Sequence, residues 1–338
     1  MVKKKRKEKV KKKLSQNIFG NGGLTLLIFG GVIGIFYQTL YLLITVEALE
    51  EQYLYYMGAR ALQELGILLL FCTLVLGCFY YRSERERFRD IAGYTLIAGT
   101  AVTIPAVCYL LYNRVSLLQD QVFTLRTFLI QTLPTLLSSI SRIYILAGAL
   151  FLGIMFIGYL RKKSWSDSFF ISGTFTGCAV LVILLYVVYD SYSIFQEQGA
   201  SRDLIFARAI IPDSLMILSY MLILIGVLLF AVSRLWDRRD VVTWTGRTWL
   251  LGGISGAFFK FTQLGMNSEM IHNEILRVRQ YIMELTPYST SLNDLPLTTE
   301  TLREYYIKKM IPLYMDHALW VVLFSAIAML GIYFWTKK

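Results

Sequence analysis

Apolar residues in this chain gather in long runs, and each run is followed by a shorter stretch rich in charged or polar residues. A helix that crosses the ~30 Å hydrocarbon core of a bilayer needs about 20 apolar residues. The pattern therefore predicts an all-α integral membrane protein with eight transmembrane helices. The predicted spans are 24–46, 65–81, 91–113, 143–160, 168–189, 214–235, 248–265 and 315–335.

Composition agrees with this prediction. The chain has 338 residues, of which 56% are hydrophobic, and its mean hydropathy is +0.53. Such a chain is too apolar for a soluble domain, whose surface is largely polar. The span at 248–265 is the weakest of the eight, because it is short and contains Lys260 and Gln263.

The distribution of basic residues predicts the orientation of the chain in the membrane. Lys and Arg concentrate in the loops on the cytoplasmic side, and here they favour a multi-pass plasma-membrane protein with both termini in the cytoplasm. The first thirteen residues hold nine basic side chains and form a predicted cytoplasmic tail that lies on the anionic inner leaflet. This run has no aromatic residues between its charges, so nucleic acid is not an expected partner.

The chain also carries an internal repeat. The segment FGGVIGIFYQ at 29–38 matches LGGISGAFFK at 251–260 in its pattern of glycines and apolar residues. Related small-residue motifs open the third and fifth spans, and aromatic residues followed by cations end the even spans. We therefore expect four tandem hairpins of the same orientation, at 14–90, 91–167, 168–247 and 248–338.

The glycines of this repeat are spaced four residues apart in three of the hairpins. On a helix this spacing places both small residues on one face, where a neighbouring helix can approach closely. We interpret them as helix-packing positions rather than as a phosphate-binding loop, because continuous apolar helix surrounds them. The positions are Gly30, Gly34, Gly173, Gly177, Gly252 and Gly256.

Amphipathic helices are expected to cap the extracytoplasmic face. The largest outer segment, 266–312, contains apolar residues at alternating steps of four and three, which is typical of an amphipathic helix. These residues are Ile271, Ile275, Val278, Ile282 and Leu285. Shorter apolar stripes occur at 49–56 and 118–129, and Thr301 with Glu304 has the spacing of a capping box. Such a cap could dock a protein partner, and a homo-oligomer is also compatible with the sequence.

Lys260 is the ionisable residue placed deepest in a predicted span. It follows Arg247 by thirteen residues, which is about 20 Å along a helix. A lysine at that depth either extends toward the interface or serves as the counter-charge of an anionic solute or lipid group. Gln38, at the matching position of the first hairpin, and Gln263 are candidate ligand-binding residues beside it.

The sequence gives weaker support for a metal site, a haem site or an enzymatic activity. His272 and His317 could form a small metal or haem site in the fourth hairpin, although ordinary interfacial histidines explain them as well. The four cysteines fall within predicted spans and show no metal-type spacing. No recognisable catalytic motif occurs, so enzymatic activity and a bound cofactor are not expected.

Three functions remain open from the sequence. A permease-like transport component would handle an amphipathic or anionic solute at Lys260 and Gln38. A non-catalytic membrane subunit would dock a partner through its outer helical cap or its basic tail. A haem- or metal-binding membrane protein would use His272 and His317.

Overall fold

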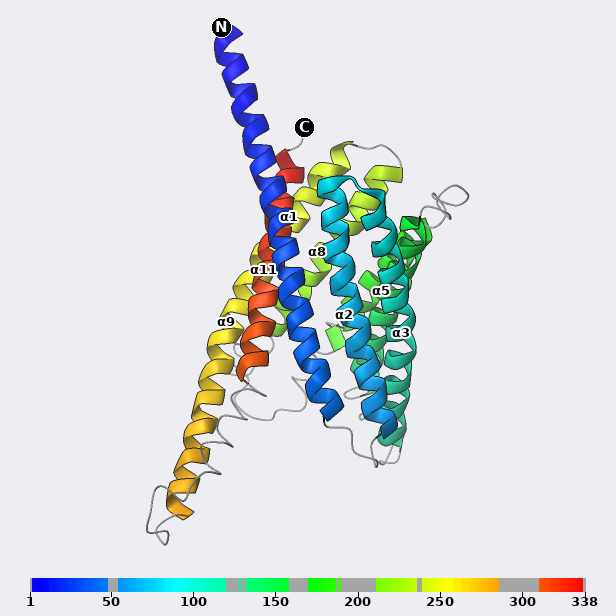
Figure 1. The fold of residues 1–338 in the computed structure, drawn as a ribbon, viewed down its shortest axis with the longest axis vertical. Helices are drawn as coiled ribbons and strands as arrows, with labels where there is room; N and C mark the ends of the chain where they lie inside the picture. The colour runs from blue at the N-terminus through cyan, green and yellow to red at the C-terminus, as the bar shows by residue number, and fades with distance from the viewer. Residues whose placement is uncertain are drawn as a thin grey trace.

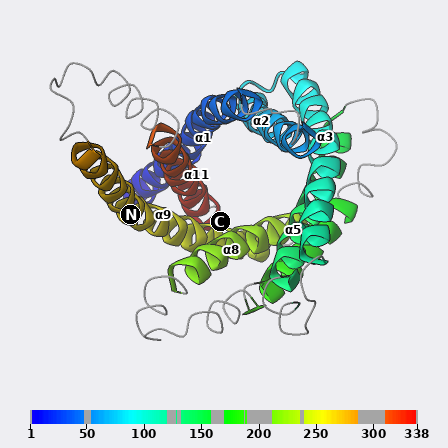
Figure 2. The same ribbon diagram turned by 90° about the horizontal axis from the view of Figure 1, so that it is seen from below.

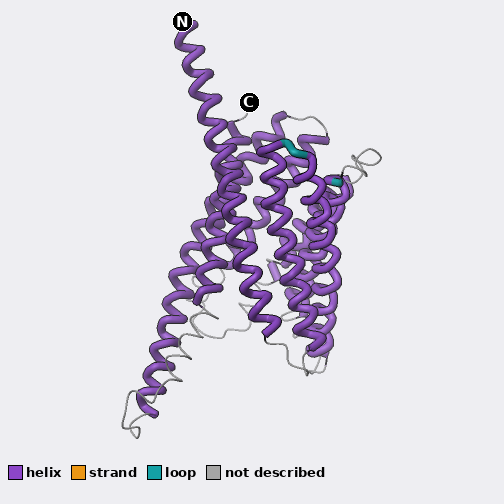
Figure 3. The backbone as a smooth tube through the Cα atoms, viewed as in Figure 1, coloured by secondary structure: helices purple, strands orange, loops and turns teal. Residues whose placement is uncertain are grey.

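A computed structural model describes residues 2–47, 54–119, 128, 132–157, 170–186, 188–189, 211–235, 239–285 and 310–336, with side chains in α1 from Ile18 and in α9 as far as Gly265. This part of the chain forms eight long helices and no strand (Figures 1 and 3). They are α1 (Val2–Glu47), α2 (Leu54–Ser83), α3 (Glu86–Gln119), α5 (Leu133–Phe156), the helix Phe170–Tyr186, α8 (Ile211–Leu235), α9 (Arg239–Leu285) and α11 (Ile311–Thr336). The prediction of an all-α protein is confirmed.

Six of these helices are long and apolar enough to cross a membrane. The six candidate spans are Ile18–Val46, Tyr55–Ser83, Glu86–Asn113, Leu133–Phe156, Met216–Ser233 and Ile311–Thr336. They overlap six of the eight spans predicted from the sequence. Many of their large apolar side chains are exposed, for example Phe36 and Leu43 on α1, as expected of helices that face lipid. The chain is therefore a membrane-embedded protein.

The other two predicted spans differ from these six. Phe170–Tyr186 is apolar but shorter than the other spans. The span expected at 248–265 lies inside α9, where glycines, hydroxyl residues, Lys260 and Gln263 lower the hydropathy below that of a membrane-spanning helix. Composition alone thus supports six spans among the described residues.

Two helices are much longer than the sequence pattern suggested. The basic segment 1–13 was expected to be a separate tail, but α1 is helical from Val2 and continues without a break into the first span. The amphipathic stripe that ends at Leu285 was expected in a separate cap helix, but α9 runs unbroken from Arg239 to Leu285. No proline interrupts α9, so nothing local ends the helix after the apolar run.

Other parts of the expected cap lie mostly outside the described residues, including Thr301 and Glu304.

The turn between α2 and α3 is described: Glu84 adopts a left-handed conformation with φ of 54°. Its backbone N–H donates to the carbonyl of Tyr80 at 2.7 Å and so caps the end of α2. The hairpin boundary predicted at residue 90 falls within α3.

The helices are arranged as a ring when viewed along the bundle (Figure 2). Packing follows the order α8, α9, α11, α1, α2, α3 and α5, with each helix against the next. The helix Phe170–Tyr186 packs on α5, where the Ser172 hydroxyl donates to the carbonyl of Gly148 at 2.8 Å. The contact between α1 and α11 joins the first and last parts of the chain, and both termini lie at the same end of the bundle (Figure 1).

Glycines form the closest helix contacts of the ring. A Cβ at Gly246 of α9 would lie 2.7 Å from the carbonyl oxygen of Gly331 in α11, and one at Gly331 would lie 2.8 Å from the carbonyl of Gly246. Similar reciprocal pairs join α2 to α3 and α3 to α5, through Gly66 with Gly99 and Gly93 with Gly153. Small residues let these backbones approach as they do in other membrane bundles.

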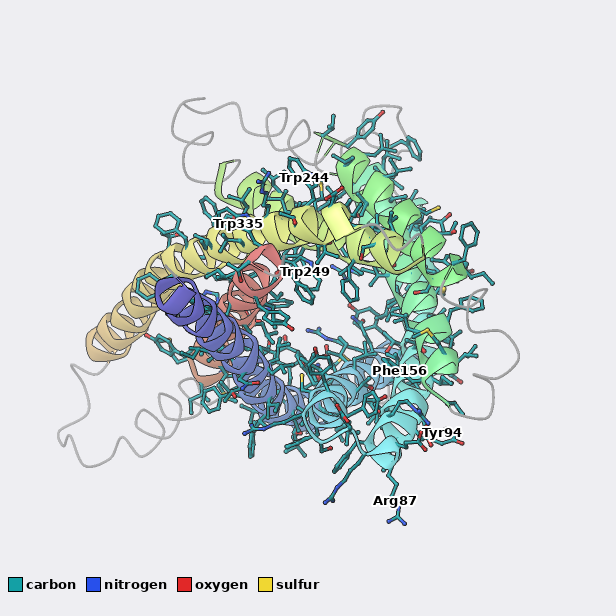
Figure 4. The ribbon with its side chains drawn as sticks, turned by 90° about the horizontal axis from the view of Figure 1, so that it is seen from above. Arg87, Tyr94, Phe156, Trp244, Trp249 and Trp335 are labelled. Carbon is teal, nitrogen blue, oxygen red and sulfur yellow. The ribbon has the colours of Figure 1, made fainter. Side chains whose placement is uncertain are left out.

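Tryptophans and a cation surround the contact of α9 with α11 near the terminal end of the bundle. The guanidinium of Arg247 lies 4.7 Å from the ring centroid of Trp244 and 5.9 Å from that of Trp335. The indole N–H of Trp249 donates to the carbonyl of Ile223 in α8 at 3.1 Å. Figure 4 shows the three tryptophans gathered along this side of the ring. An Arg and Trp belt of this kind is typical of a membrane interface.

Candidate functional site

An ion pair lies inside the bundle at the end opposite the termini. Lys260 Nζ of α9 is 3.1 Å from Asp316 Oδ2 of α11. The Lys260 side chain is 14% exposed and that of Asp316 is 25% exposed, so both charges are largely removed from the surface. Asp316 belongs to a candidate membrane span, where an unpaired carboxylate would be costly. The pair offsets that cost and joins the two helices.

Asp316 accepts further hydrogen bonds from its own helix. The indole N–H of Trp320, one turn along, donates to Asp316 Oδ1 at 3.0 Å. The Nδ1 atom of His317 lies 3.3 Å from Asp316 Oδ2. His317 is 3% exposed and also interacts with the backbone of Gln263 in α9. Both carboxylate oxygens of Asp316 are therefore occupied.

Aromatic rings surround the carboxylate. Tyr220 of α8 packs edge-on against Trp320, with 5.5 Å between ring centroids. Tyr220 also lies 5.5 Å from Phe324, and its hydroxyl is within electrostatic range of Asp316. The phenol of Tyr220 from α8 and the indole of Trp320 from α11 therefore lie near the carboxylate of Asp316.

A second acid is bound between α1 and α2. The side-chain amide of Gln38 in α1 donates to Glu64 Oε2 in α2, and Gln38 is buried. Near it, Arg60 donates to the Tyr41 hydroxyl at 3.2 Å and lies 5.8 Å from the centroid of the Tyr41 ring. These contacts tie α1 to α2 as Lys260 and Asp316 tie α9 to α11.

Tyr37 lies near both pairs. It is on α1, next to Gln38, and its hydroxyl is within electrostatic range of Asp316 of α11 and of Glu64 of α2. The contact of α1 with α11 accounts for this proximity. We refer to Tyr37, Gln38, Glu64, Lys260, Asp316 and His317 as the polar cluster. It draws side chains from α1, α2, α9 and α11.

The two pairs occupy matching positions of the sequence repeat. Gln38 ends FGGVIGIFYQ and Lys260 ends LGGISGAFFK, and each bonds an acid on the next long helix of its own predicted hairpin. The sequence suggested that these two residues face one cavity. In the structure they have different acid partners, and Tyr37 lies within electrostatic range of both acids.

The repeated glycines meet neighbouring helices in most cases. Gly34 faces the ring of Phe71 in α2, and Gly256 faces the ring of Phe324 in α11, in each case with 2.6 Å or less from a built Cβ to the nearest ring carbon. Gly30 faces Leu323 of α11. The two glycines of the first motif therefore contact different helices, although the sequence placed them at one packing face.

The other three glycines of the repeated motifs differ in how closely they approach a neighbouring helix. Gly252 lies against the α8 backbone, where a Cβ would be 3.0 Å from the carbonyl oxygen of Ser219. A Cβ at Gly177 would reach Leu228 at 4.0 Å, and one at Gly173 would meet nothing within 4 Å among the described atoms.

Tyr37 and Glu64 of the polar cluster did not emerge as site residues from the sequence, and His317 was expected only as a metal or haem ligand. Glu64 and Asp316 lie near the ends of apolar runs, where acids are common, and Tyr37 is one of 22 tyrosines. The most useful signal was the spacing of four between Asp316 and Trp320, which places a carboxylate and an indole on one helix face. Their meeting with α9 depends on helix packing.

Of the two histidines predicted to form a metal site, only His317 has a described side chain. Among the described residues, no group of three or more His, Cys, Asp or Glu side chains is placed to hold a metal ion. His317 is engaged by Asp316. His272 belongs to α9, and its side chain is not among those described.

Comparisons with known proteins give no assignment. No family model matches the chain, and neither a curated protein nor a solved structure matches it.

Proposed function

We propose that this protein is a permease-like membrane transport component and that its polar cluster is the binding site for an amphipathic or anionic solute. The observation that supports this most strongly is the pairing of Lys260 with Asp316 and of Gln38 with Glu64 within largely apolar helices. Ionisable side chains inside a membrane are expensive and mark solute or ion pathways more often than they serve packing.

Lys260 is the residue on which solute binding depends in this proposal. Its ammonium has three N–H groups, and the bond to Asp316 uses one of them. The side chain keeps a small exposed fraction of 14%. Its remaining donors are available for an anionic oxygen of a solute, while Asp316 keeps the ammonium charged and oriented. Gln38 and Gln263 supply polar groups nearby.

The test is untargeted mass spectrometry of small molecules and lipids that purify with the protein in mild detergent. Wild type is compared with Lys260→Met and Lys260→Arg, and Gly77→Ala serves as a control because a Cβ there meets nothing within 4 Å. We expect a ligand that is present in wild type, the Arg variant and the control, and depleted in the Met variant. An identical set of bound molecules in all four proteins would contradict the proposal.

The orientation proposed for this function places both termini in the cytoplasm of a plasma-membrane protein. Both termini lie at one end of the bundle (Figure 1), and that end carries the basic segment of α1. Fluorescent-protein fusions at each end, which fluoresce inside and fail outside, test it. A dark fusion at either terminus would contradict this orientation.

A second function is supported by a separate observation. α9 is 47 residues long, or about 70 Å, and it extends past the other helices at the end opposite the termini (Figure 1). Its last part carries the apolar stripe of Ile275, Ile282 and their neighbours. A non-catalytic subunit could dock a partner along this extension. The double substitution Ile275→Asp and Ile282→Asp should then release a co-purifying protein, and retention of that protein would exclude docking through this stripe.

A further inference from the structure

We infer that the polar cluster binds a zwitterionic amphiphile, with its phosphate at Lys260 and its ammonium group at Asp316, in preference to a purely anionic one. This inference rests on the proposed function, since it concerns the solute of the same site. The sequence left the solute open between an amphipathic and an anionic molecule, and the inference narrows it to a zwitterionic amphiphile.

The hydrogen bonds of the ion pair decide where a phosphate can bind. Asp316 accepts from Lys260 at Oδ2 and from Trp320 at Oδ1 and lies next to His317, so three of its roughly four acceptor positions are used. Lys260 makes one described hydrogen bond and retains donors. Phosphate oxygens are strong acceptors for ammonium groups. Most of the open hydrogen-bonding capacity of the pair is thus that of the Lys260 donors, which suits a phosphate.

The charge of the pair decides what else the ligand must carry. Lys260 and Asp316 together are neutral, so an anion that bound Lys260 alone would leave a net negative charge inside the bundle. An uncompensated charge in the bundle interior carries a large desolvation penalty. A ligand that brings its own cation avoids it, because its ammonium can face Asp316 while its phosphate faces Lys260.

The surroundings of Asp316 suit an ammonium group. The carboxylate is 25% exposed, and Trp320 and Tyr220 pack beside it. The face of an aromatic ring attracts alkylammonium groups, and choline is bound in this way by aromatic side chains in other proteins. The carboxylate with its aromatic neighbours therefore offers a cation site beside the anion site of Lys260.

The depth of the pair suits a lipid headgroup. Asp316 is the sixth residue of α11, which starts at Ile311, or about 8 Å from the start of that helix. A phosphate–ammonium group could reach this depth as the headgroup of a phospholipid or as a free water-soluble phosphoester. The shared chemistry is the zwitterion, and the experiment separates the two sources.

The experiment is a competition measured by native mass spectrometry. The detergent-purified full-length protein is mixed with equal amounts of phosphatidylcholine and phosphatidylglycerol that have identical acyl chains. Wild type should retain the zwitterionic lipid over the anionic one by about tenfold, the effect of a single charge-assisted interaction. Phosphocholine is then added: displacement of the bound lipid shows that the headgroup suffices, and lack of displacement shows that the site requires the lipid form.

Variants separate a binding site from a structural ion pair. Lys260→Met should abolish the preference and Lys260→Arg should keep it. Asp316→Asn should reverse it toward phosphatidylglycerol, because the lysine then lacks its internal counter-charge. Arg247→Met is the matched control, since it removes a cation that contacts Trp244 and Trp335 at the other end of the bundle, and it should keep the wild-type preference.

The inference is overturned if wild type prefers the anionic lipid or shows no preference, or if Asp316→Asn does not reverse the order. If Lys260→Met does not fold, the Arg and Asn variants still decide. A measurement of solute flux in proteoliposomes separates the proposed transport function from the proposed zwitterion site. Selective binding without any transport would refute the transport function alone, and transport without headgroup preference would refute the zwitterion site alone.

Discussion

Replacing Gly331 by alanine should destabilise the bundle at the contact between α9 and α11. A Cβ at this position would lie 2.5 Å from the Leu250 backbone nitrogen, 2.8 Å from the Gly246 carbonyl oxygen and 2.9 Å from the Leu250 Cα. All three are backbone atoms of α9, so no side chain can rotate away. The two helices would have to separate along their contact.

The expected magnitude follows from two opposing terms. Overpacking by one methyl group in a rigid contact costs about 1–3 kcal/mol. Alanine in place of glycine within a helix recovers up to about 1 kcal/mol. We expect Gly331→Ala to lower the free energy of unfolding by about 1–2 kcal/mol. The control is Gly77→Ala in α2, because a Cβ there meets nothing within 4 Å and only the favourable helix term applies.

The assay is reversible unfolding in mixed micelles with increasing SDS, followed by the reaction of a thiol dye with Cys78, which is 5% exposed in the folded bundle. Gly331→Ala should unfold at a lower SDS fraction than wild type, and Gly77→Ala at an equal or higher one. Equal midpoints for the two alanine variants would refute the close backbone contact of α9 with α11.

Three further contacts are tested by the same assay. Lys260→Met and Asp316→Met should each lower the free energy of unfolding by up to about 3–5 kcal/mol. The double variant should lose less than the sum of these two losses, because removing both charges leaves none unpaired. Additive losses would show that the pair is not coupled. Trp249→Phe should cost about 0.6–1.7 kcal/mol through the lost hydrogen bond to the α8 carbonyl, and an unchanged midpoint would contradict that bond. Gly34→Ala should be destabilising in wild type and partly rescued by Phe71→Leu, because the built Cβ meets the flexible phenyl ring; no rescue would place the strain elsewhere.

Much of the fold could be predicted from the hydrophobic pattern. Six candidate spans fall where the apolar runs predicted them, and the prolines at 134, 212 and 312 each fall in the first turn of a helix, as the missing proline N–H requires. The length of α9 could not be predicted in this way. Its middle contains glycines, Lys260 and Gln263, so the apolar run ends long before the helix does.

The candidate site could be predicted only in part. Lys260 and Gln38 stood out because each is a polar residue at the same position of a repeated apolar motif. Their partners Asp316 and Glu64 depend on which helices pack together, and hydrophobic periodicity carries no information about that. Tyr37, which interacts with both acids, needs the contact of α1 with α11, the two helices most distant in the sequence.

The unbroken length of α9 also has a mechanical consequence. A straight helix of 47 residues behaves as a rod of about 70 Å, and a tilt of roughly 5° moves one end by about 6 Å relative to the other. The rod rests on α11 at Gly246 and Gly331, where the backbones touch, and it carries Lys260 between that support and its projecting end. Force applied to the projecting end would therefore act directly on the ion pair with Asp316. In the same way, a change in that pair would move the end of α9 that lies far outside the bundle.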